Sequence, residues 1–192
     1  MTVQSITRKG SFDSGHRVMN EKMKCFNMHG HTYLYELTFG FTTMEQIGYA
    51  IDFKEIKRVA CQWIDDVLDH GMILNPLDEE VIAATKATGS KMWLMSLNGE
   101  GKYCNPSVEN IAREIFLAME CLFTSYPSLM IKEIRLWETP NCMTTCWATS
   151  IPEKERNNWF EVRAKEVLAY AADKGIVEYD DRKTQKDEKE AN

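Results

Sequence analysis

The chain lacks the features that would direct it to a membrane, to secretion or to a nucleic acid. No apolar run among its 192 residues approaches the roughly 18 residues that span a bilayer. The segment 1–10 has no apolar stretch of the kind found in signal peptides. With 23 lysines and arginines against 29 aspartates and glutamates, no basic block is long enough to follow a phosphate backbone. We therefore expect a cytoplasmic protein with neither a membrane nor a nucleic-acid partner.

Disulfides and repeats are also not expected. Without an export signal, the six cysteines are better interpreted as reduced thiols. No internal repeat of fixed period is found, and a hydrophobic content of 44% is enough for one core, so we expect a single domain over 1–175. Beyond Tyr179 almost every residue is polar or charged, which predicts a disordered polar tail over 176–192.

Histidine is scarce, with four in the chain, and two of them stand one residue apart. His29 and His31 open a segment whose odd positions are mostly aromatic or aliphatic, the period of a half-buried strand: Tyr33, Tyr35, Leu37, Phe39 and Phe41. Side chains two residues apart on a strand point the same way. Both imidazoles can therefore reach one metal ion.

A third histidine stands at the end of an earlier extended run, which covers 3–12. If this run and the segment from His29 form an antiparallel hairpin, His16 falls beside His29 and His31. Three neutral imidazoles with one open position are typical of catalytic zinc. The alternative is a set of ordinary strand or surface histidines.

Positive charge gathers around these histidines although the chain as a whole carries a net charge of -6. The cluster consists of Arg8, Lys9, Arg17, Lys22 and Lys24. It suits a small anionic ligand better than a polymer. A solvated loop face explains it equally well.

A helix is predicted after the strand segment. Asp52 can cap it and Glu55 stands where a capping box needs a carboxylate, followed by apolar residues at helical spacing: Ile56, Val59, Ala60, Trp63, Ile64, Val67 and Leu68. We expect Gly71 to close the helix in the left-handed conformation, which leaves His70 where the dipole favours its charged form. Asp69 can contact His70 only in the terminal turn or beyond, because helix neighbours face about 100° apart. The alternative is that both act only as caps.

The second half of the chain contains a less regular piece over 76–104 and three further elements. Asn105 or Ser107 can cap a second amphipathic helix, and two strands then meet at a turn at Pro140. Glu138 stands at the end of the apolar face of the first of these strands. Its carboxylate either anchors a ligand or is simply exposed at the end of the strand. A third helix is expected over 150–175.

This order of elements predicts an α+β domain. Hairpins at both ends with two amphipathic helices between them indicate a four-stranded antiparallel sheet covered on one face, with the piece at 76–104 inserted. The strands leave few charges on either face. We therefore expect the bare face to be covered by oligomerisation.

Six motifs in a fixed order resemble the 6-pyruvoyl-tetrahydropterin synthase and 6-carboxy-tetrahydropterin synthase family. They are Phe12-Asp13-Ser14-Gly15-His16-Arg17, Cys25-x3-His29-Gly30-His31, Ile51-Asp52-Phe53, Leu68-Asp69-His70, Pro106-Ser107-Val108-Glu109-Asn110 and Glu138-Thr139. The resemblance covers residues 1 to about 149. It implies a tunnelling fold in which sheets of several copies assemble into a barrel, with active sites at the subunit interfaces.

The resemblance also implies roles for individual residues. It gives one Zn²⁺ per chain on His16, His29 and His31, and catalytic roles to Cys25, Asp69 and His70. Glu138 would anchor a pterin ring, and the stretch Ser107, Val108 and Glu109 would help to hold the ring from a neighbouring subunit. We further expect Lys24 to contact the substrate, and Lys22 or Lys24 to help the metal activate the thiol.

Three residues between the cysteine and His-Gly-His resemble the bacterial 6-carboxy enzymes of queuosine and 7-deazaguanine synthesis. The implied activity is that of a zinc-dependent carbon–carbon lyase, which converts 7,8-dihydroneopterin triphosphate to 6-carboxy-5,6,7,8-tetrahydropterin, acetaldehyde and triphosphate. One alternative is a 6-pyruvoyl-tetrahydropterin synthase, which keeps the side chain. A remote one is a non-catalytic zinc module closed by Cys25. The insertion and the third helix depart from minimal members and leave the pocket's shape open.

Overall fold

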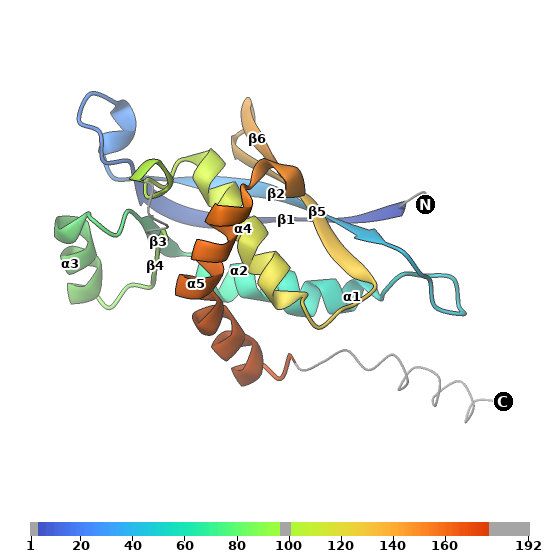
Figure 1. Cartoon of the computed structure of the whole chain (residues 1–192). Coiled ribbons are helices and arrows are strands. Elements are labelled where there is room, and N and C mark those ends of the chain that lie inside the picture. Colours follow the sequence, from blue (N-terminus) through green and yellow to red (C-terminus); the bar gives the residue numbers. More distant parts are fainter. Residues whose placement is uncertain (1–3, 97–100, 177–192) are drawn as a thin grey trace.

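A long hairpin forms the centre of the molecule. The computed structural model describes residues 4–96 and 101–176, so most of the predicted tail lies outside the described residues. β1 (Gln4–Arg17) and β2 (His29–Phe41) pair antiparallel from Gln4 opposite Phe41 to His16 opposite His29 (Figure 1). The predicted hairpin is confirmed, and it places the first and second histidines directly across from each other.

The sheet has six strands, and the prediction of four was wrong. β5 (Leu129–Thr139) and β6 (Cys142–Trp147) extend it antiparallel on one side of the hairpin, in the order β4-β3-β1-β2-β5-β6. On the other side β3 (Gly71–Leu74) pairs parallel with β1, and β4 (Met92–Leu94) pairs parallel with β3. The domain is therefore α+β with a mixed sheet. Strands of four and three residues are too short to give a recognisable period.

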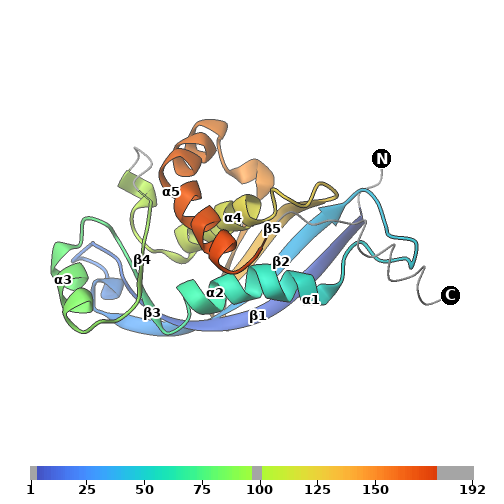
Figure 2. The same cartoon turned by 90° about the horizontal axis from the view of Figure 1, so that it is seen from below.

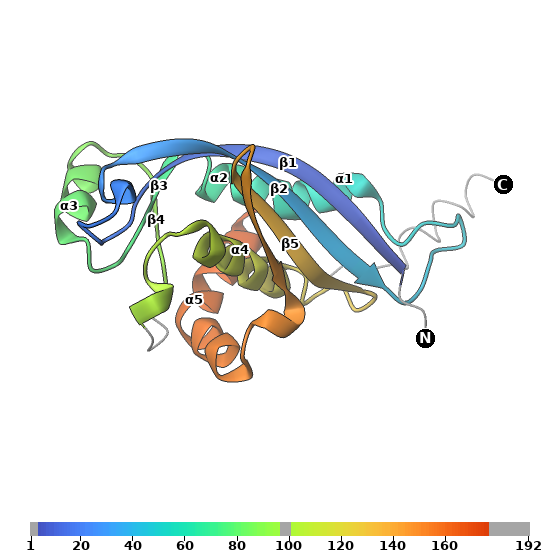
Figure 3. The same ribbon diagram turned by 90° about the horizontal axis from the view of Figure 1, so that it is seen from above.

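Helices cover one face of this sheet and leave the other open (Figures 2 and 3). α1 (Phe53–Ile56), a π-helical turn at Lys57–Cys61 and α2 (Gln62–Val67) form one continuous rod. α4 (Val108–Leu122) lies beside it, and α5 (Glu153–Asp173) packs on α4. The predicted apolar side of the first helix is buried, and Trp63 is 1% exposed.

The helix starts agree with the predicted caps in part. The side chain of Asp52 accepts a hydrogen bond from the Lys54 amide, and Ser107, one of the two candidates, caps α4. Glu55 does not complete a capping box. Its carboxylate instead accepts a hydrogen bond from Arg58 Nε at 2.8 Å and one from the Tyr126 hydroxyl at 2.6 Å. The tertiary contact with Tyr126 thus replaces the local one.

The inserted piece is a compact unit at the edge of the sheet. It contains α3 (Glu79–Ala87), β4 and a 3-10 turn at Gly101–Tyr103. Gly89 ends α3 with a φ of +68°, as its sequence position indicates. The strand β3 joins this unit to the hairpin, so the insertion lies next to the histidine end of β1.

Buried charges attach α5 to the rest of the domain. Arg113 on α4 forms an ion pair with Glu155 on α5, and both are 5% exposed. The neighbouring Glu114 accepts from Trp159 Nε1 at 2.8 Å and from the Ser96 amide at 2.9 Å. Because each of these polar groups is buried, their partners are needed for stability. The insertion, α4 and α5 therefore form one linked body.

The open face of the sheet carries apolar side chains as well as charges. Leu34 on β2 is 47% exposed, and Trp147 on β6 is 51% exposed. The expected oligomeric barrel would cover this face, and it stays a prediction. Among the described residues, no helix is both long and apolar enough to cross a bilayer.

Candidate metal centre and active site

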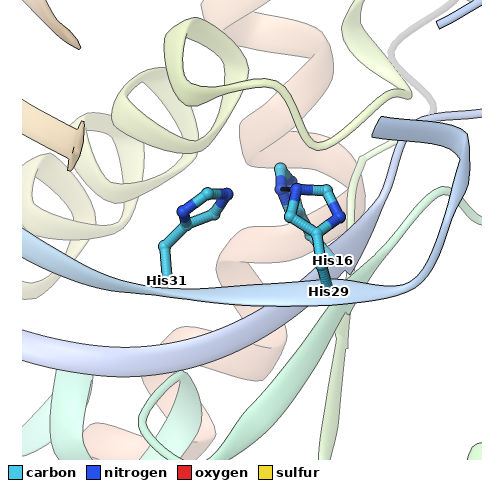
Figure 4. A group of neighbouring side chains, drawn as sticks. All are labelled: His16, His29 and His31. Atoms are coloured by element: carbon cyan, nitrogen blue, oxygen red, sulfur yellow. Dashed lines mark hydrogen bonds between the residues drawn. The ribbon is translucent and has the colours of Figure 1, made fainter. Parts of the chain in front are cut away.

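Three imidazoles converge above the histidine end of the hairpin. His16, His29 and His31 project from β1 and β2 to the same side of the sheet, the side that the helices cover (Figure 4). Their ligand nitrogens lie within 4.8 Å of one another. The two closest, Nε2 of His16 and Nε2 of His29, are 3.1 Å apart. The predicted grouping is therefore present.

Backbone carbonyls fix two of the three rings. His16 Nδ1 lies 2.7 Å from the Pro106 carbonyl oxygen, and His29 Nδ1 lies 2.7 Å from the Asn27 carbonyl oxygen. A carbonyl only accepts, so each Nδ1 carries the proton and each Nε2 presents a lone pair. Such a carbonyl partner is the usual outer contact of a metal-bound histidine.

The three Nε2 atoms fit a divalent cation. Two lone pairs that face each other at 3.1 Å repel unless a cation or a proton lies between them. The third, Nε2 of His31, is buried and has no hydrogen-bond partner among the described residues. Burial, and then the nearby His29, lower the pKa of His16, which keeps the ring neutral as ligation requires. Three nitrogen donors, with no fourth ligand atom in the same 4.8 Å group among the described residues, match a catalytic zinc site.

Glu138 lies at the edge of the three imidazoles. Its Oε1 is 3.7 Å from His16 Nε2 and 3.8 Å from His31 Nε2, and its side chain is 21% exposed. Glu138 is therefore not a freely exposed residue at the end of its strand, which was the alternative that the sequence left open. A half-buried carboxylate beside a group of neutral rings can accept hydrogen bonds from a ligand.

Cys25 is close to this site but outside the nitrogen cluster. It lies in a 3-10 turn at Lys24–Phe26 and is half-buried, and it is not a member of the group whose ligand atoms lie within 4.8 Å. Burial raises the pKa of Tyr33, and Glu138 and Cys25 add to the effect because both lie near the phenol. The rings of Tyr33 and His31 lie side by side, with their centres 5.7 Å apart. The thiol therefore lies near the three imidazoles but is not a member of their 4.8 Å group.

Asp69 and His70 form a hydrogen-bonded pair. His70 Nδ1 lies 2.5 Å from Asp69 Oδ2. This contact is possible because His70 lies beyond the helix with a φ of +54°; the prediction that Gly71 would take the left-handed conformation was wrong. Gly71 instead begins β3, where an added Cβ would lie 2.8 Å from Lys91 Cγ. The hydrogen bond to Asp69 and the charge of Asp69 raise the pKa of His70, which favours imidazolium.

The pair lies on the opposite face of the sheet from the three imidazoles. Phe12, Ser14 and His16 are buried under the helices, so the Asp13 carboxylate between them points to the open face, where it clusters with Asp69 and His70. A hollow of about 380 Å³ on that face is lined in part by Asp13, Thr32 and His70. One chain thus presents the three imidazoles on one face and the Asp69–His70 pair on the other.

The match to a family model agrees with this geometry. Residues 5–149 match the model described as 6-pyruvoyl tetrahydropterin synthase. The chain belongs to this family. Proteins named 6-carboxy-5,6,7,8-tetrahydropterin synthase are 36% identical in Rickettsia bellii and 37% identical in Rickettsia felis, each over 71% of this chain and 94% of the relative.

Solved structures support the family fold. An uncharacterised protein from Wolinella succinogenes has a TM-score of 0.59 at 19% identity, covering 77% of this chain and 99% of that one. The 6-pyruvoyl tetrahydropterin synthase of Caenorhabditis elegans has a TM-score of 0.52 at 22% identity, covering 77% and 97%. At these identities the likeness concerns the fold alone.

The remaining residues that the family resemblance singles out lie at two places. Ser107 and Val108 begin α4 directly after Pro106, whose carbonyl holds His16, and Glu109 is exposed in the first turn. Lys24 is exposed in the turn that carries Cys25. Of the predicted set, the structure brings together the histidines and Glu138, and separately Asp69 and His70.

Sequence reasoning did not single out Asp13, which contacts the Asp69–His70 pair. The amide of Asp13 donates to Asp69 Oδ1 at 2.7 Å, and the Asp13 carbonyl accepts from the His70 amide at 2.6 Å. Its carboxylate accepts from Thr32 Oγ1 at 2.5 Å and belongs to the same cluster as Asp69 and His70. The signal was available, since Asp13 alternates with buried residues on β1 and must point to the other face.

Proposed function

We propose that this protein is a zinc-dependent lyase that converts 7,8-dihydroneopterin triphosphate and one water to 6-carboxy-5,6,7,8-tetrahydropterin, with release of acetaldehyde and triphosphate. The convergence of ligand nitrogens from three histidines, within 4.8 Å of one another and near a half-buried thiol, carries the proposal. The names of the Rickettsia relatives favour the 6-carboxy product. The place of such a product would be the synthesis of queuosine and other 7-deazaguanines.

One Zn²⁺ on His16, His29 and His31 would supply Lewis acidity to hydroxyl groups of the substrate's side chain. The protein's part is to keep the three rings neutral and aligned. The Pro106 and Asn27 carbonyls do so by holding Nδ1–H of two rings.

Proton transfer would fall to two groups of opposite character. Cys25 as thiolate would remove a proton from a carbon that bears a hydroxyl, with Lys24 next to it in the same turn. His70 would donate a proton, because Asp69 favours its charged form and fixes its ring. Two successive proton transfers require a base and an acid in different environments, which Cys25 and His70 would provide.

The pterin ring would be oriented by Glu138. Its carboxylate would accept hydrogen bonds from ring N–H groups, a charge-assisted contact that fixes orientation. The start of α4, at Ser107, Val108 and Glu109, would line the ring's other edge. Lys24 would contact the triphosphate.

The separation of the two clusters supports an active site shared between copies. The metal cluster lies under the helices and the Asp69–His70 pair lies on the open face, so a second copy is needed to bring an acid to the metal. Mixing a His31→Ala variant with a His70→Asn variant tests this arrangement. We expect mixed oligomers to regain activity that neither variant has alone, whereas no recovery would place both groups of one site in one chain.

The product decides between the two family reactions. Incubation of the zinc-loaded protein with dihydroneopterin triphosphate should yield acetaldehyde and the 6-carboxy pterin, identified by mass spectrometry. Triphosphate release without acetaldehyde would show the 6-pyruvoyl reaction instead. The absence of any product, with zinc bound by four protein ligands, would leave the structural zinc module; the position of Cys25 outside the nitrogen cluster argues against it.

A further inference from the structure

We propose that Asp78, in the inserted piece, is a positioning residue for the catalytic thiol and acts through Arg17 and Phe26. The inference rests on the proposed function, in which Cys25 is the base. We call residues 18–28, which connect β1 to β2 and carry Cys25, the thiol loop. The inserted piece then has a defined task, which is to hold this loop in place.

The first step is an ion pair across the sheet edge. Arg17 is the last residue of β1, and its Nη2 donates to Asp78 Oδ1 at 3.2 Å while its Nε lies 3.0 Å from Oδ2. The carboxylate of Asp78 is 1% exposed, and the Arg17 side chain is 14% exposed. A buried carboxylate must keep its cation, because an unpaired charge there is costly. The position of the guanidinium is therefore set by the insertion.

The second step leads from the guanidinium to the thiol loop. The Arg17 guanidinium carbon lies 4.6 Å from the centre of the Phe26 ring, within the range of a cation–π contact. Phe26 follows Cys25 directly in the 3-10 turn. Asp78 therefore contacts the Arg17 guanidinium, and the guanidinium contacts Phe26, which is the residue next to Cys25.

The thiol loop has few other means of support. Met19, Met23 and Met28 are 38%, 52% and 55% exposed, so the loop buries little apolar surface. Its hydrogen bonds are mostly local, such as that from the Val18 amide to the Cys25 carbonyl at 2.8 Å; at its start the Met19 amide also donates to Asn105 Oδ1 at 2.9 Å. A segment with so few buried contacts opens at low free-energy cost unless an anchor holds it. The Arg17–Phe26 contact is such an anchor.

The chain offers a matched control. Glu80 Oε2 also lies near the Arg17 guanidinium, 3.6 Å from Nη2, but the Glu80 side chain is 84% exposed. An exposed ion pair of this kind contributes little. Asp78→Asn and Glu80→Gln each remove one negative charge next to the same arginine, and only the first should disturb the thiol loop.

The test compares the alkylation of two cysteines within each variant. Zinc-loaded protein is treated with iodoacetamide at about pH 9.5, where access rather than ionisation limits a thiol, and the labelling rates of Cys25 and the exposed Cys142 are measured by peptide mass spectrometry. We expect the Cys25 to Cys142 ratio to rise about fivefold or more in Asp78→Asn, because a released loop exposes the half-buried thiol. The ratio in Glu80→Gln should stay at the wild-type value.

An unchanged ratio in folded Asp78→Asn would overturn the proposal. If that variant does not fold, Phe26→Leu, which keeps the Arg17–Asp78 pair, decides by the same ratio. In turnover, Asp78→Asn should lower kcat about tenfold with little change in KM, since misplacement of a catalytic group affects the reacting state. A raised ratio with unaltered kcat would remove the catalytic part. Labelling needs no turnover, so failure of the proposed function would be recognised separately, by inactivity of the wild type.

Discussion

The helix-covered face and the open face of the sheet both carry histidine, and the two settings favour opposite protonation states. On the covered face His16 is 1% exposed, its Nδ1–H is held by a carbonyl, and burial lowers its pKa. On the open face the side chain of His70 is 76% exposed and paired with Asp69, which raises its pKa. The first setting favours a neutral ring that can ligate a metal, and the second favours a cation that can give up a proton.

The difference shows that the partner of Nδ1, together with burial, selects what an imidazole does. A carbonyl partner carries no net charge and leaves Nε2 as a lone-pair donor. A carboxylate partner stabilises the imidazolium. The same residue type, placed at two points of one sheet, thereby serves two steps of one proposed reaction.

The strongest way to break the covered site is His31→Ala. The Nε2 atom of His31, which has no hydrogen-bond partner among the described residues, is lost, and two imidazoles do not retain zinc at ordinary concentrations. We expect zinc per chain, measured by elemental analysis, to fall to near zero, and turnover to fall by at least about 1,000-fold. Zinc retention at the wild-type level would contradict the three-histidine site.

Cys25→Ala separates the thiol from the metal. Turnover should be abolished because the proposed base is lost, while zinc stays near one per chain, since the thiol is not a member of the nitrogen cluster. Loss of zinc together with activity would make Cys25 a fourth ligand, and the site would then be structural.

Asp69→Asn weakens the open-face site alone. We expect kcat to fall about 100-fold with zinc unchanged, because the proton donor loses its anionic partner. The sign of the pH effect follows from the raised pKa of His70: activity needs the protonated ring and falls as pH rises through that pKa. In the variant the pKa is lower, so the alkaline limb of the kcat profile moves to lower pH. A limb that does not move would exclude His70 as the acid.

Glu138→Gln tests whether the covered face also holds the ring of the substrate. An amide cannot accept two charge-assisted hydrogen bonds, so we expect KM to rise about tenfold, with zinc content unchanged. An unchanged KM would remove Glu138 from the pterin site, and a loss of zinc would make it a metal ligand.

The smallest effect is expected for Asp13→Asn, which sharpens the comparison at the open face. The backbone bonds of Asp13 to Asp69 and His70 remain, and only the second negative charge near His70 is lost. Lys91 acts on the pKa of His70 in the opposite direction. We expect kcat to fall a few-fold, with the alkaline limb shifted in the same direction as in Asp69→Asn but less. Thr32→Val, which removes only the hydroxyl that holds Asp13, serves as the control.

The sequence predicted structure best where a regular alternation of residue types continued over many positions. Thirteen residues of β2 with alternating character were enough to predict the hairpin and the position of His16 opposite His29. The strands β3 and β4 were missed or left open because four and three residues cannot show a period. The left-handed conformation was expected at Gly71 from propensity, but the Asp13 carbonyl fixes it at His70.

Site residues were predictable when the chain itself brought them together, and less so when tertiary contacts did. His29 and His31 are two apart on one strand, whereas Asp13 reaches Asp69 across 56 positions of the chain. The link from Asp78 to Phe26 likewise depends on a guanidinium that nothing in its local sequence distinguishes.

The ion pair between Arg113 and Glu155 couples two distant stretches of the chain. Deleting α5 would remove Glu155 and leave Glu114, 3.6 Å from Nη2, as the acid beside the Arg113 guanidinium. We expect a shorter relative that dispenses with this helix to carry a neutral side chain at the position of Arg113 or to supply another acid. The presence of the terminal helix and the charge at that one position should accordingly be gained or lost together.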